Sequence, residues 1–312
     1  MEYLRNHTDI KIPLIQSYGT REECPPNLGP FIIMEYAPNS GTMGKAIGMP
    51  TANGARFMLN PDVNEDKLYR AYSHMAEILL QLSKLEFSKT GSLVDRGDEQ
   101  WDIAGRPITY DMNETVQLGS LPRSKLPHGT FDTSSSFLEA CAKLHCDHFE
   151  HQRNDALSSE ADGEEKYTQR LLFRKYLQSR SNSHSSHDSG QFKLWCDDLR
   201  PSNVLVDDNL SVVSVIDWEF TYAAPPEFSN APPWWLLLVE PEKHESGVDA
   251  WAEEYDSRLK IFLAALKEQE AAMVARGTLR RDQILSNDMK KSWESGDFWV
   301  MLSCSCLHRM HD

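Results

Sequence analysis

The sequence predicts an α+β protein that has a small piece of sheet first and a large, mainly helical body after it. Three observations predict this class. Short apolar runs bounded by Gly, Pro, Asn and Ser lie near the N-terminus. Most of the later chain repeats apolar residues every three or four positions, which is the period of an amphipathic helix. One stretch of the helical body, LWCDDLRPSNVLVDDNLSVVSVIDWEF at 194–220, instead has the pattern of a β-hairpin.

The first elements are short. Residues 1–10 have the pattern of the end of a helix, and 12–18 that of a short strand. The segment TREECPPNLGP at 20–30 predicts a turn, because it combines Pro, Gly and Asn. The run FIIMEYA at 31–37 predicts a buried strand, and Pro38, Asn39 and Ser40 end it.

The body that follows is predicted to be helical. Apolar side chains recur on one face in four segments: 65–87, 134–153, 164–178 and 249–275. A hairpin is predicted over Leu93–Tyr110. The segment 179–190 is predicted to be a polar loop, because so many serines cannot pack in a core. With Gln178 before it, its sequence is QSRSNSHSSHDSG.

Composition narrows the class of protein. The chain has 312 residues, 40% of them apolar, which suffices for a sizeable core. The formal net charge of −15 argues against a nucleic-acid partner and permits a cationic substrate. Six irregularly spaced cysteines are typical of reduced thiols. No run is long and apolar enough for a signal peptide or a membrane span. We therefore expect a cytoplasmic protein without a membrane partner.

The 194–220 segment carries the candidate chemistry. Its two apolar runs place Asp198 and Asn203 before the first strand and Asp217 after the second, so an antiparallel hairpin brings these residues together. Amide and carboxylate oxygens suit magnesium, and a further carboxylate can accept a proton from an attacking hydroxyl. The alternative is that Asp198 and Asn203 are only turn residues of a structural hairpin.

These motifs together resemble a known family. Cys196-Asp-Asp-Leu-Arg-Pro-Ser-Asn203, followed by Asp217-Trp218, is similar to the His-Gly-Asp-Leu-x-x-x-Asn loop and metal-binding Asp of the aminoglycoside phosphotransferase and choline kinase family. YLRNHTDI, FIIMEYAP and IDWEFTYAAPPEFSNAPPWWLLL resemble the phosphotransferase-like branch of filamentous fungi. The likeness covers roughly residues 1–300.

The resemblance implies a protein-kinase-like fold, with a partial N-lobe and hinge at 1–38 and a helical C-lobe at 39–312. It implies an ATP- and Mg²⁺-dependent phosphotransferase that acts on a hydroxyl of a small molecule. The implied site residues are the base Asp198, the metal ligands Asn203 and Asp217, and the adenine-binding backbone of Glu35, Tyr36 and Ala37.

The chain also departs from the family. It supplies neither a Gly-rich loop nor the phosphate-binding Lys. Lys11 follows the first helix and is not assigned that role, and Gly41-Thr-Met-Gly-Lys45 lacks P-loop spacing and is predicted to be a connecting loop. The alternative function is thus a catalytically inactive, kinase-like remnant or binding protein. Both termini lead us to expect an incomplete gene model or an alternative transcript.

Three further features each allow two interpretations. Cys196 stands where the family has His, and a catalytic thiol is one alternative. His145, His148 and His151 have a spacing that zinc can use, or form a polar helix face. The pair Trp234-Trp235 either lines an acceptor pocket or packs in the core.

Two charged residues and one further kinase class remain. Asp197 and Glu219 either attract a cationic acceptor or hydrogen-bond Arg200. A protein kinase is the weaker alternative, because Asp217-Trp-Glu and Pro-Pro-Glu-Phe replace that class's Asp-Phe-Gly and Ala-Pro-Glu.

Overall fold

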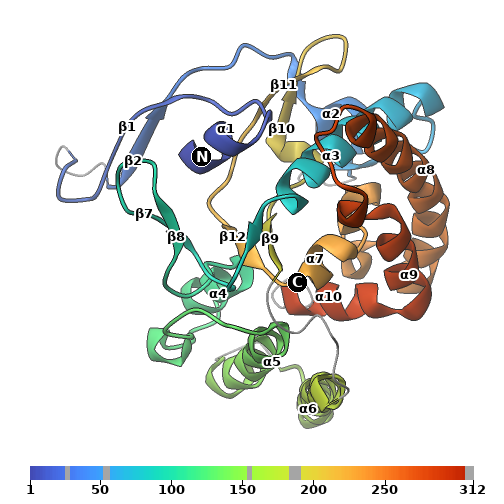
Figure 1. The fold of residues 1–312 in the computed structure, drawn as a ribbon. Helices are drawn as coiled ribbons and strands as arrows, with labels where there is room; N and C mark the ends of the chain where they lie inside the picture. The colour runs from blue at the N-terminus through green and yellow to red at the C-terminus, as the bar shows by residue number, and fades with distance from the viewer. Residues whose placement is uncertain (25–28, 52–56, 153–156, 183–190, 306–312) are drawn as a thin grey trace. The chain divides into compact units, whose positions relative to one another are not determined.

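The computed structural model describes residues 1–24, 29–51, 57–152, 157–182 and 191–305 (Figure 1). The chain divides into two compact units, each built from segments that are far apart in the sequence. Unit 1 comprises Met1–Gln81, Asp198–Trp218 and Trp234–Thr278, and unit 2 comprises Leu82–Asp197, Glu219–Pro233 and Leu279–Asp312. These bounds differ from the expected division at residue 38, and the assignment of lobes stays a prediction.

The elements are distributed over both units. Unit 1 holds α1 (Glu2–His7), β1 (Ile15–Gly19), β2 (Phe31–Met34), β3 (Gly41–Thr42), α2 (Met43–Ile47), β4 (Gly48–Pro50), β5 (Phe57–Leu59), most of α3 (Glu65–Ser83), the 3₁₀ helix η2 (Pro201–Asn203), β10 (Val204–Val206), β11 (Val212–Val215), η3 (Trp234–Leu237), η4 (Pro241–Lys243) and α8 (Gly247–Ala275). Unit 2 holds β6 (Glu86–Phe87), β7 (Leu93–Asp95), β8 (Trp101–Ile103), α4 (Tyr110–Gln117), η1 (Arg123–Lys125), α5 (Ser134–His151), α6 (Glu160–Asn182), β9 (Phe192–Cys196), β12 (Thr221–Ala224), α7 (Pro226–Asn230), η5 (Arg281–Gln283), α9 (Ser286–Ser295) and α10 (Asp297–Ser305).

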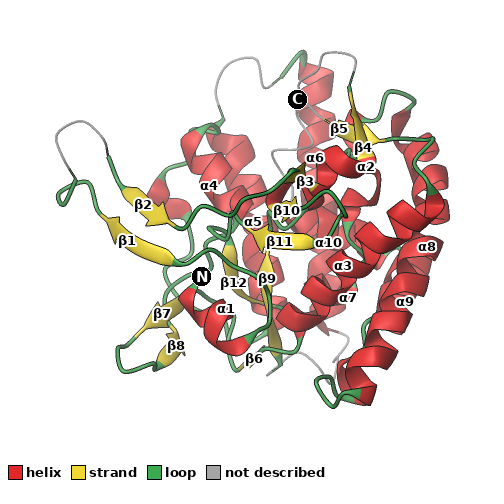
Figure 2. Ribbon diagram, turned by 90° about the horizontal axis from the view of Figure 1, so that it is seen from above, coloured by secondary structure: helices red, strands yellow, loops and turns green. Residues whose placement is uncertain are grey.

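Small antiparallel sheets and a large helical part confirm the predicted α+β class. The predicted hairpin is β10 and β11, with Val204 opposite Val215, and β3 adds a third strand through Leu205 opposite Thr42. Figure 2 shows these three strands side by side. The turn between β10 and β11 is held by Asp207 Oδ1, which accepts hydrogen bonds from the backbone N–H groups of Asn209 (2.9 Å) and Ser211 (2.8 Å).

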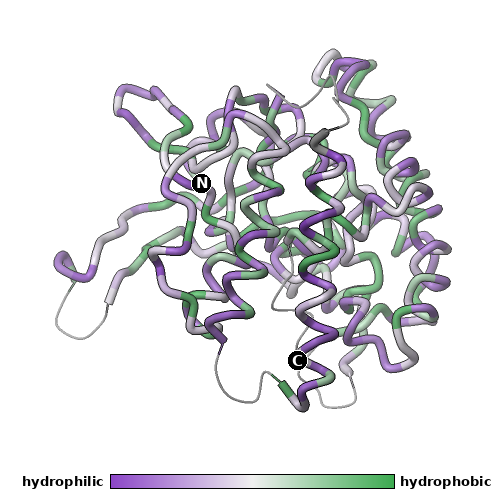
Figure 3. The backbone as a smooth tube through the Cα atoms, turned by 90° about the horizontal axis from the view of Figure 1, so that it is seen from below, coloured by the Kyte–Doolittle hydropathy of each residue, from purple (hydrophilic) through white to green (hydrophobic). Residues whose placement is uncertain are grey.

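The core of unit 1 lies where α3 meets α8. Tyr72 of α3 is fully buried, donates its hydroxyl to the carbonyl of Leu236 at 2.7 Å, and meets the ring of Phe262 edge-on. Trp251 of α8 is also fully buried and donates to the carbonyl of Val239. Hydrophobic and hydrophilic stretches alternate along the helices in Figure 3, as the period that predicted them requires. The packing buries their apolar faces.

One prediction about the N-terminal strands is wrong. The run 31–37 was expected to be buried, whereas only Phe31–Met34 forms a strand, β2, and both Ile32 (57%) and Ile33 (52%) are exposed. Successive residues of a strand point to opposite faces, so both faces of β2 are open. Its sheet has only β1 as a partner, and among the described residues no further strand extends it. A two-stranded ribbon cannot bury its own apolar side chains.

Unit 2 contains strands that the sequence did not predict. Strand β9 pairs with β12 and β6, with Cys196 opposite Thr221, so the 194–220 hairpin is not the sole sheet of the helical body. Buried and half-buried residues alternate along β9, as in a strand with one covered face. The sequence did not predict this strand, because its residues run directly into the loop that follows. Residues 179–182, expected in a loop, belong to α6, and 183–190 lie outside the described residues. A hairpin is confirmed within the expected segment Leu93–Tyr110 as β7 and β8, but it ends at Ile103, and Tyr110 begins α4.

The length and apolar character of the helices bear on the prediction about a membrane span. Within the part of the chain that the structure describes, none of the helices combines the length and the apolar character that crossing a bilayer requires.

Candidate functional site

The candidate site is built on the loop between Asp198 and Asn203, which lies entirely in unit 1. Pro201 opens the 3₁₀ helix η2, which ends at Asn203. The Asn203 side chain is 5% exposed, and its Nδ2 donates to the backbone carbonyl of Asp198 at 2.8 Å and to the Asp198 Oδ2 atom at 3.0 Å. Because the nitrogen makes both bonds, the amide oxygen is the atom left to meet another group.

Asp217 is brought to the same end of the hairpin by strand register. The N–H of Ile216 donates to the carbonyl of Asn203 at 2.9 Å, which extends the β10–β11 ladder by one step beyond Val204 and Val215. Asp217 is the next residue and is exposed. Its φ of 60° lies in the left-handed region, which is uncommon for a residue other than Gly. Such backbone strain concentrates at functional sites.

A buried tryptophan holds the strained residue in place. Trp218 is 7% exposed and donates its Nε1 to the carbonyl of Val215 at 2.9 Å. This anchor and the ladder bond fix the backbone on both sides of Asp217. The structure therefore brings Asp198 and Asn203 into direct contact and carries Asp217 to the strand end beside Asn203.

Arg200 forms an ion pair with the proposed base. Its Nε lies 3.1 Å from the Asp198 Oδ1 atom, and Asn203 binds the Oδ2 atom of the same carboxylate. Both oxygens are thus oriented by neighbours from the same short loop. The sequence missed this pair, because Arg200 was assigned to Asp197 or Glu219; its position two residues after Asp198 was the available signal.

Asp197 has a different role from either expectation. It is 8% exposed and accepts hydrogen bonds from the Tyr110 N–H (2.9 Å), the Trp195 indole (2.8 Å) and the Tyr222 hydroxyl (3.1 Å), all in unit 2. Burial, with the nearby Asp197 charge, raises the pKa of Tyr222 well above its ordinary value. Three donors hold this carboxylate within the packing of unit 2. We therefore do not assign Asp197 a role in binding a cationic acceptor.

A supporting glycine was also missed. The segment Gly41–Lys45, expected to be a connecting loop, forms β3 and the start of α2. A Cβ on Gly44 would lie 2.9 Å from Ser202 Oγ and 3.2 Å from the Ser202 backbone nitrogen. Only a glycine lets α2 approach η2 this closely. Helix α2 therefore supports the loop that carries Asp198 and Asn203.

The predicted adenine-binding backbone lies just after β2. The N–H of Glu35 donates to the Leu14 carbonyl at 2.8 Å, and the Ala37 carbonyl accepts from Asn39 Nδ2 at 2.9 Å. The carbonyl of Glu35 and the N–H of Ala37 make no hydrogen bond with the residues that the structure describes. Tyr36 between them is 78% exposed.

Burial distinguishes the alternatives for Cys196, for the histidines of α5 and for Trp235. Cys196 ends β9 and is 3% exposed, so its thiol does not face substrate. The ring of His145 stacks on Phe173, and His148 is buried, so this stripe is part of the packing of α5. Trp235 is 2% exposed and packs on Phe262, which supports a core role.

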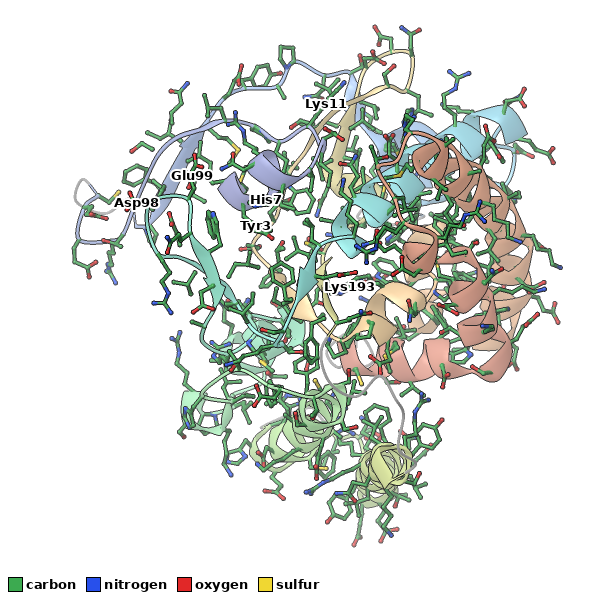
Figure 4. All side chains as sticks on the ribbon, in the orientation of Figure 1. Tyr3, His7, Lys11, Asp98, Glu99 and Lys193 are labelled. Carbon is green, nitrogen blue, oxygen red and sulfur yellow. The ribbon has the colours of Figure 1, made fainter. Side chains whose placement is uncertain are left out.

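Two expectations about cations concern the wider site. Lys11, labelled in Figure 4, donates its ammonium to the Val212 carbonyl at 2.8 Å and so caps β11. Across the described ranges, no three His, Cys, Asp or Glu side chains gather as a metal centre. Asn203 and Asp217 would supply one amide and one carboxylate oxygen, and the remaining positions of a magnesium ion would fall to phosphates and water.

Comparisons with known proteins give few matches. No family model and no curated protein matches the chain. Two solved structures of thermostable mutants of aminoglycoside phosphotransferase APH(4)-Ia, each a ternary complex with AMP-PNP and hygromycin B, are similar to it. The first is 15% identical over 99% of this chain and 80% of that chain, with a TM-score of 0.44. The second is 14% identical over 99% and 81%, with a TM-score of 0.36. Values this low say nothing of the site, so function is inferred from this chain's own residues.

Proposed function

We propose that this protein is a kinase-like phosphotransferase that uses ATP and Mg²⁺ to phosphorylate a hydroxyl of a small molecule. The observation that carries the proposal is the Asp198–Asn203 contact at the end of the hairpin where Asp217 also lies. A buried amide that holds one carboxylate, and a strained backbone that carries a second, both cost folding free energy. A surface loop without a function does not need this arrangement. It suits a site that positions a proton acceptor and oxygen ligands.

The nucleotide would lie along β10. Val204 and Val206 are buried, whereas Leu205 between them is only half-buried and faces the other side of the strand. We assign Leu205 as the apolar surface under the base, with the Glu35 carbonyl and the Ala37 N–H reading the adenine edge. Three residues of strand span about 10 Å, which separates the base from phosphates near Asn203.

Each acid has one role in this proposal. Asn203 Oδ1 and Asp217 would hold Mg²⁺, which neutralises phosphate charge when bound. Asp198 accepts the proton of the acceptor hydroxyl as its oxygen bonds to the terminal phosphorus and the bond to the departing ADP breaks. Asn203 Nδ2 keeps the Asp198 carboxylate aimed during this step. The chain's acidity permits a cationic acceptor, and a cytoplasmic location stays a prediction.

The experiment is a calorimetric titration of ATP into the purified chain, with and without Mg²⁺. We expect Mg²⁺-dependent binding that Asp217→Asn abolishes and that Asp198→Asn retains. Asp249→Asn, an exposed acid of α8 in the same unit, is the matched control. No binding in a well-folded sample, or equal binding by Asp217→Asn and Asp249→Asn, refutes the proposal.

A second candidate is a nucleotide-binding protein without transfer activity. The observation in its favour is the Asp198 carboxylate, whose Oδ1 pairs with Arg200 while Oδ2 accepts from Asn203. A carboxylate that is held by an ion pair and by an amide can also serve only to shape the loop. ATP consumption in the presence of aminoglycosides or amino alcohols separates the candidates. A phosphotransferase consumes ATP with one of these compounds, whereas a binding protein binds ATP and consumes none. The Arg200→Ala variant of a binding protein also consumes none.

A further inference from the structure

A cavity of about 360 Å³ lies in unit 1 at the turn end of the β10–β11 hairpin. Its wall is formed by Ser40, Gly41, Thr42, Lys45, Ala46, Lys67, Val206, Asp207, Asp208 and Leu210. These residues come from β3 and the residue before it, from α2, from the first turn of α3, and from the end of β10 and the hairpin turn, near the labels β10, β11, α2 and α3 in Figure 1. Asn203 and Asp217 lie at the opposite end of the same strands. The cavity thus lies away from the candidate metal ligands, and neither Leu205 nor the backbone of Glu35 and Ala37 lines it.

The donors of this cavity are the reason to assign it a ligand. Lys45 and Lys67 are exposed, and neither ammonium forms an ion pair with any residue that the structure describes. Two cations on different elements that line one cavity repel each other. In a chain of net charge −15, acids were abundant enough to pair with them. A bound anion would relieve the repulsion.

Two hydroxyl groups add to the lysines. Thr42 Oγ1 accepts the Lys45 backbone N–H at 3.2 Å, so its own proton is left to donate, and Ser40 also lines the wall. Gly41 has a φ of 140°, which L side chains rarely adopt, so glycine is needed where the wall turns. Two ammonium groups and two hydroxyls match the several acceptor oxygens of a phosphate dianion.

The acids of the wall limit the ligand without excluding it. Asp207 is committed to its own turn: the backbone N–H of Ser211, with that of Asn209, holds the pKa of its carboxyl below the ordinary value, and its Oδ1 accepts from both. Lys11 adds an offsetting positive charge nearby. Asp208 is exposed, and both carboxylates of the wall oppose an anion through their negative charge.

We propose that this cavity binds a small phosphomonoester through Lys45, Lys67, Ser40 and Thr42. Its volume is at the lower end of the range for small-molecule pockets, which is larger than a bare phosphate ion needs and suits an ester with a short organic part. The proposal does not depend on the proposed function, because it uses none of the residues assigned to nucleotide or metal.

The test is a calorimetric titration of glycerol phosphate into the full chain at low ionic strength. The Lys45→Gln/Lys67→Gln variant should bind at least about tenfold more weakly, because it loses two charge-assisted contacts. Lys89→Gln/Lys267→Gln removes the same charge from exposed lysines outside the cavity, and should stay within about twofold of the unchanged protein. Asp208→Asn should tighten binding about threefold, because it removes a like charge.

Further arms separate the alternatives. Inorganic phosphate should bind more weakly than glycerol phosphate, and equal binding would overturn the ester assignment. Asp217→Asn should bind glycerol phosphate normally, because loss there would place the ligand in the nucleotide site and overturn the cavity. Equal weakening by the two lysine pairs, or no binding by the unchanged protein, would also overturn it. Thermal unfolding of every variant checks that the exposed substitutions leave the fold intact.

Discussion

Replacing Gly44 with Ala tests whether α2 supports the Asp198–Asn203 loop. The added Cβ would lie 2.9 Å from Ser202 Oγ, 3.2 Å from its nitrogen and 3.3 Å from its Cα. The hydroxyl can rotate away, but the backbone atoms cannot, so α2 or η2 must shift. Overpacking of this kind costs about 1–3 kcal/mol. The higher helix propensity of Ala returns about 1 kcal/mol. We therefore expect a net loss of about 0–2 kcal/mol in the free energy of unfolding.

Urea unfolding measures this loss, and Gly163→Ala is the matched control. Gly163 is also helical, but its Cβ would meet only the two methyl groups of Leu157, at 3.4 and 3.9 Å, so Ala should stabilise there by up to about 1 kcal/mol. Adding Ser202→Ala to Gly44→Ala should recover part of the loss and reveal coupling of about 0.5 kcal/mol or more. If Gly44→Ala stabilises the protein as much as Gly163→Ala does, α2 is not packed against the loop as argued.

A shift of η2 should reach the proposed site as well. Asn203 ends η2 and holds the Asp198 carboxylate, so Gly44→Ala should weaken Mg²⁺-dependent ATP binding by more than its stability loss alone explains in a folded sample. Unchanged ATP affinity together with a measured stability loss would show that the strain is absorbed by α2.

Three further predictions concern stability. Lys193, labelled in Figure 4, donates to Glu86 and is the main cause that holds the pKa of Glu86 at about 2, below the ordinary 4.5. A depressed carboxyl pKa stabilises above the unfolded value and loses this stability as pH falls from 4.5 toward about 2. Lys193→Met should thus cost about 1 kcal/mol at neutral pH after solvent screening, and acid titration of unfolding should show the difference fading over that window; a constant difference would contradict the reasoning. Ile33→Ala should cost less than about 1 kcal/mol because half of Ile33 is exposed, whereas Ile47→Ala, at a fully buried position, should cost about 2–5 kcal/mol by denaturant unfolding; equal costs would mean that β2 is covered in solution. Asp197→Asn should cost about 1–3 kcal/mol in thermal unfolding, because an amide that still accepts from Trp195 and Tyr222 turns its NH₂ group toward the Tyr110 N–H; a neutral result would mean that this network is slack.

The local patterns predicted the helices and the hairpin well. The segments predicted at 65–87, 134–153 and 249–275 form α3, α5 and α8, except that Glu86 and Phe87 form β6 instead of ending the first helix. Strands β10 and β11 form from the two Val-rich runs. Such patterns succeed because amphipathic period and turn chemistry are properties of neighbouring residues. The prediction of a buried strand at 31–37 was wrong, because burial depends on what covers a strand and not on its composition.

For the site, the sequence by itself determined which residues can do chemistry: Asp198, Asn203 and Asp217 carry the oxygen atoms, and the hairpin around them follows from its own residues. Only the tertiary structure decided how these groups are held. The Arg200 pairing and the Gly44–Ser202 contact depend on loop geometry and on elements that are distant in the sequence. The cavity between Lys45 and Lys67 arises in the same way, because β3 pairs with β10 although the two strands are far apart in the sequence.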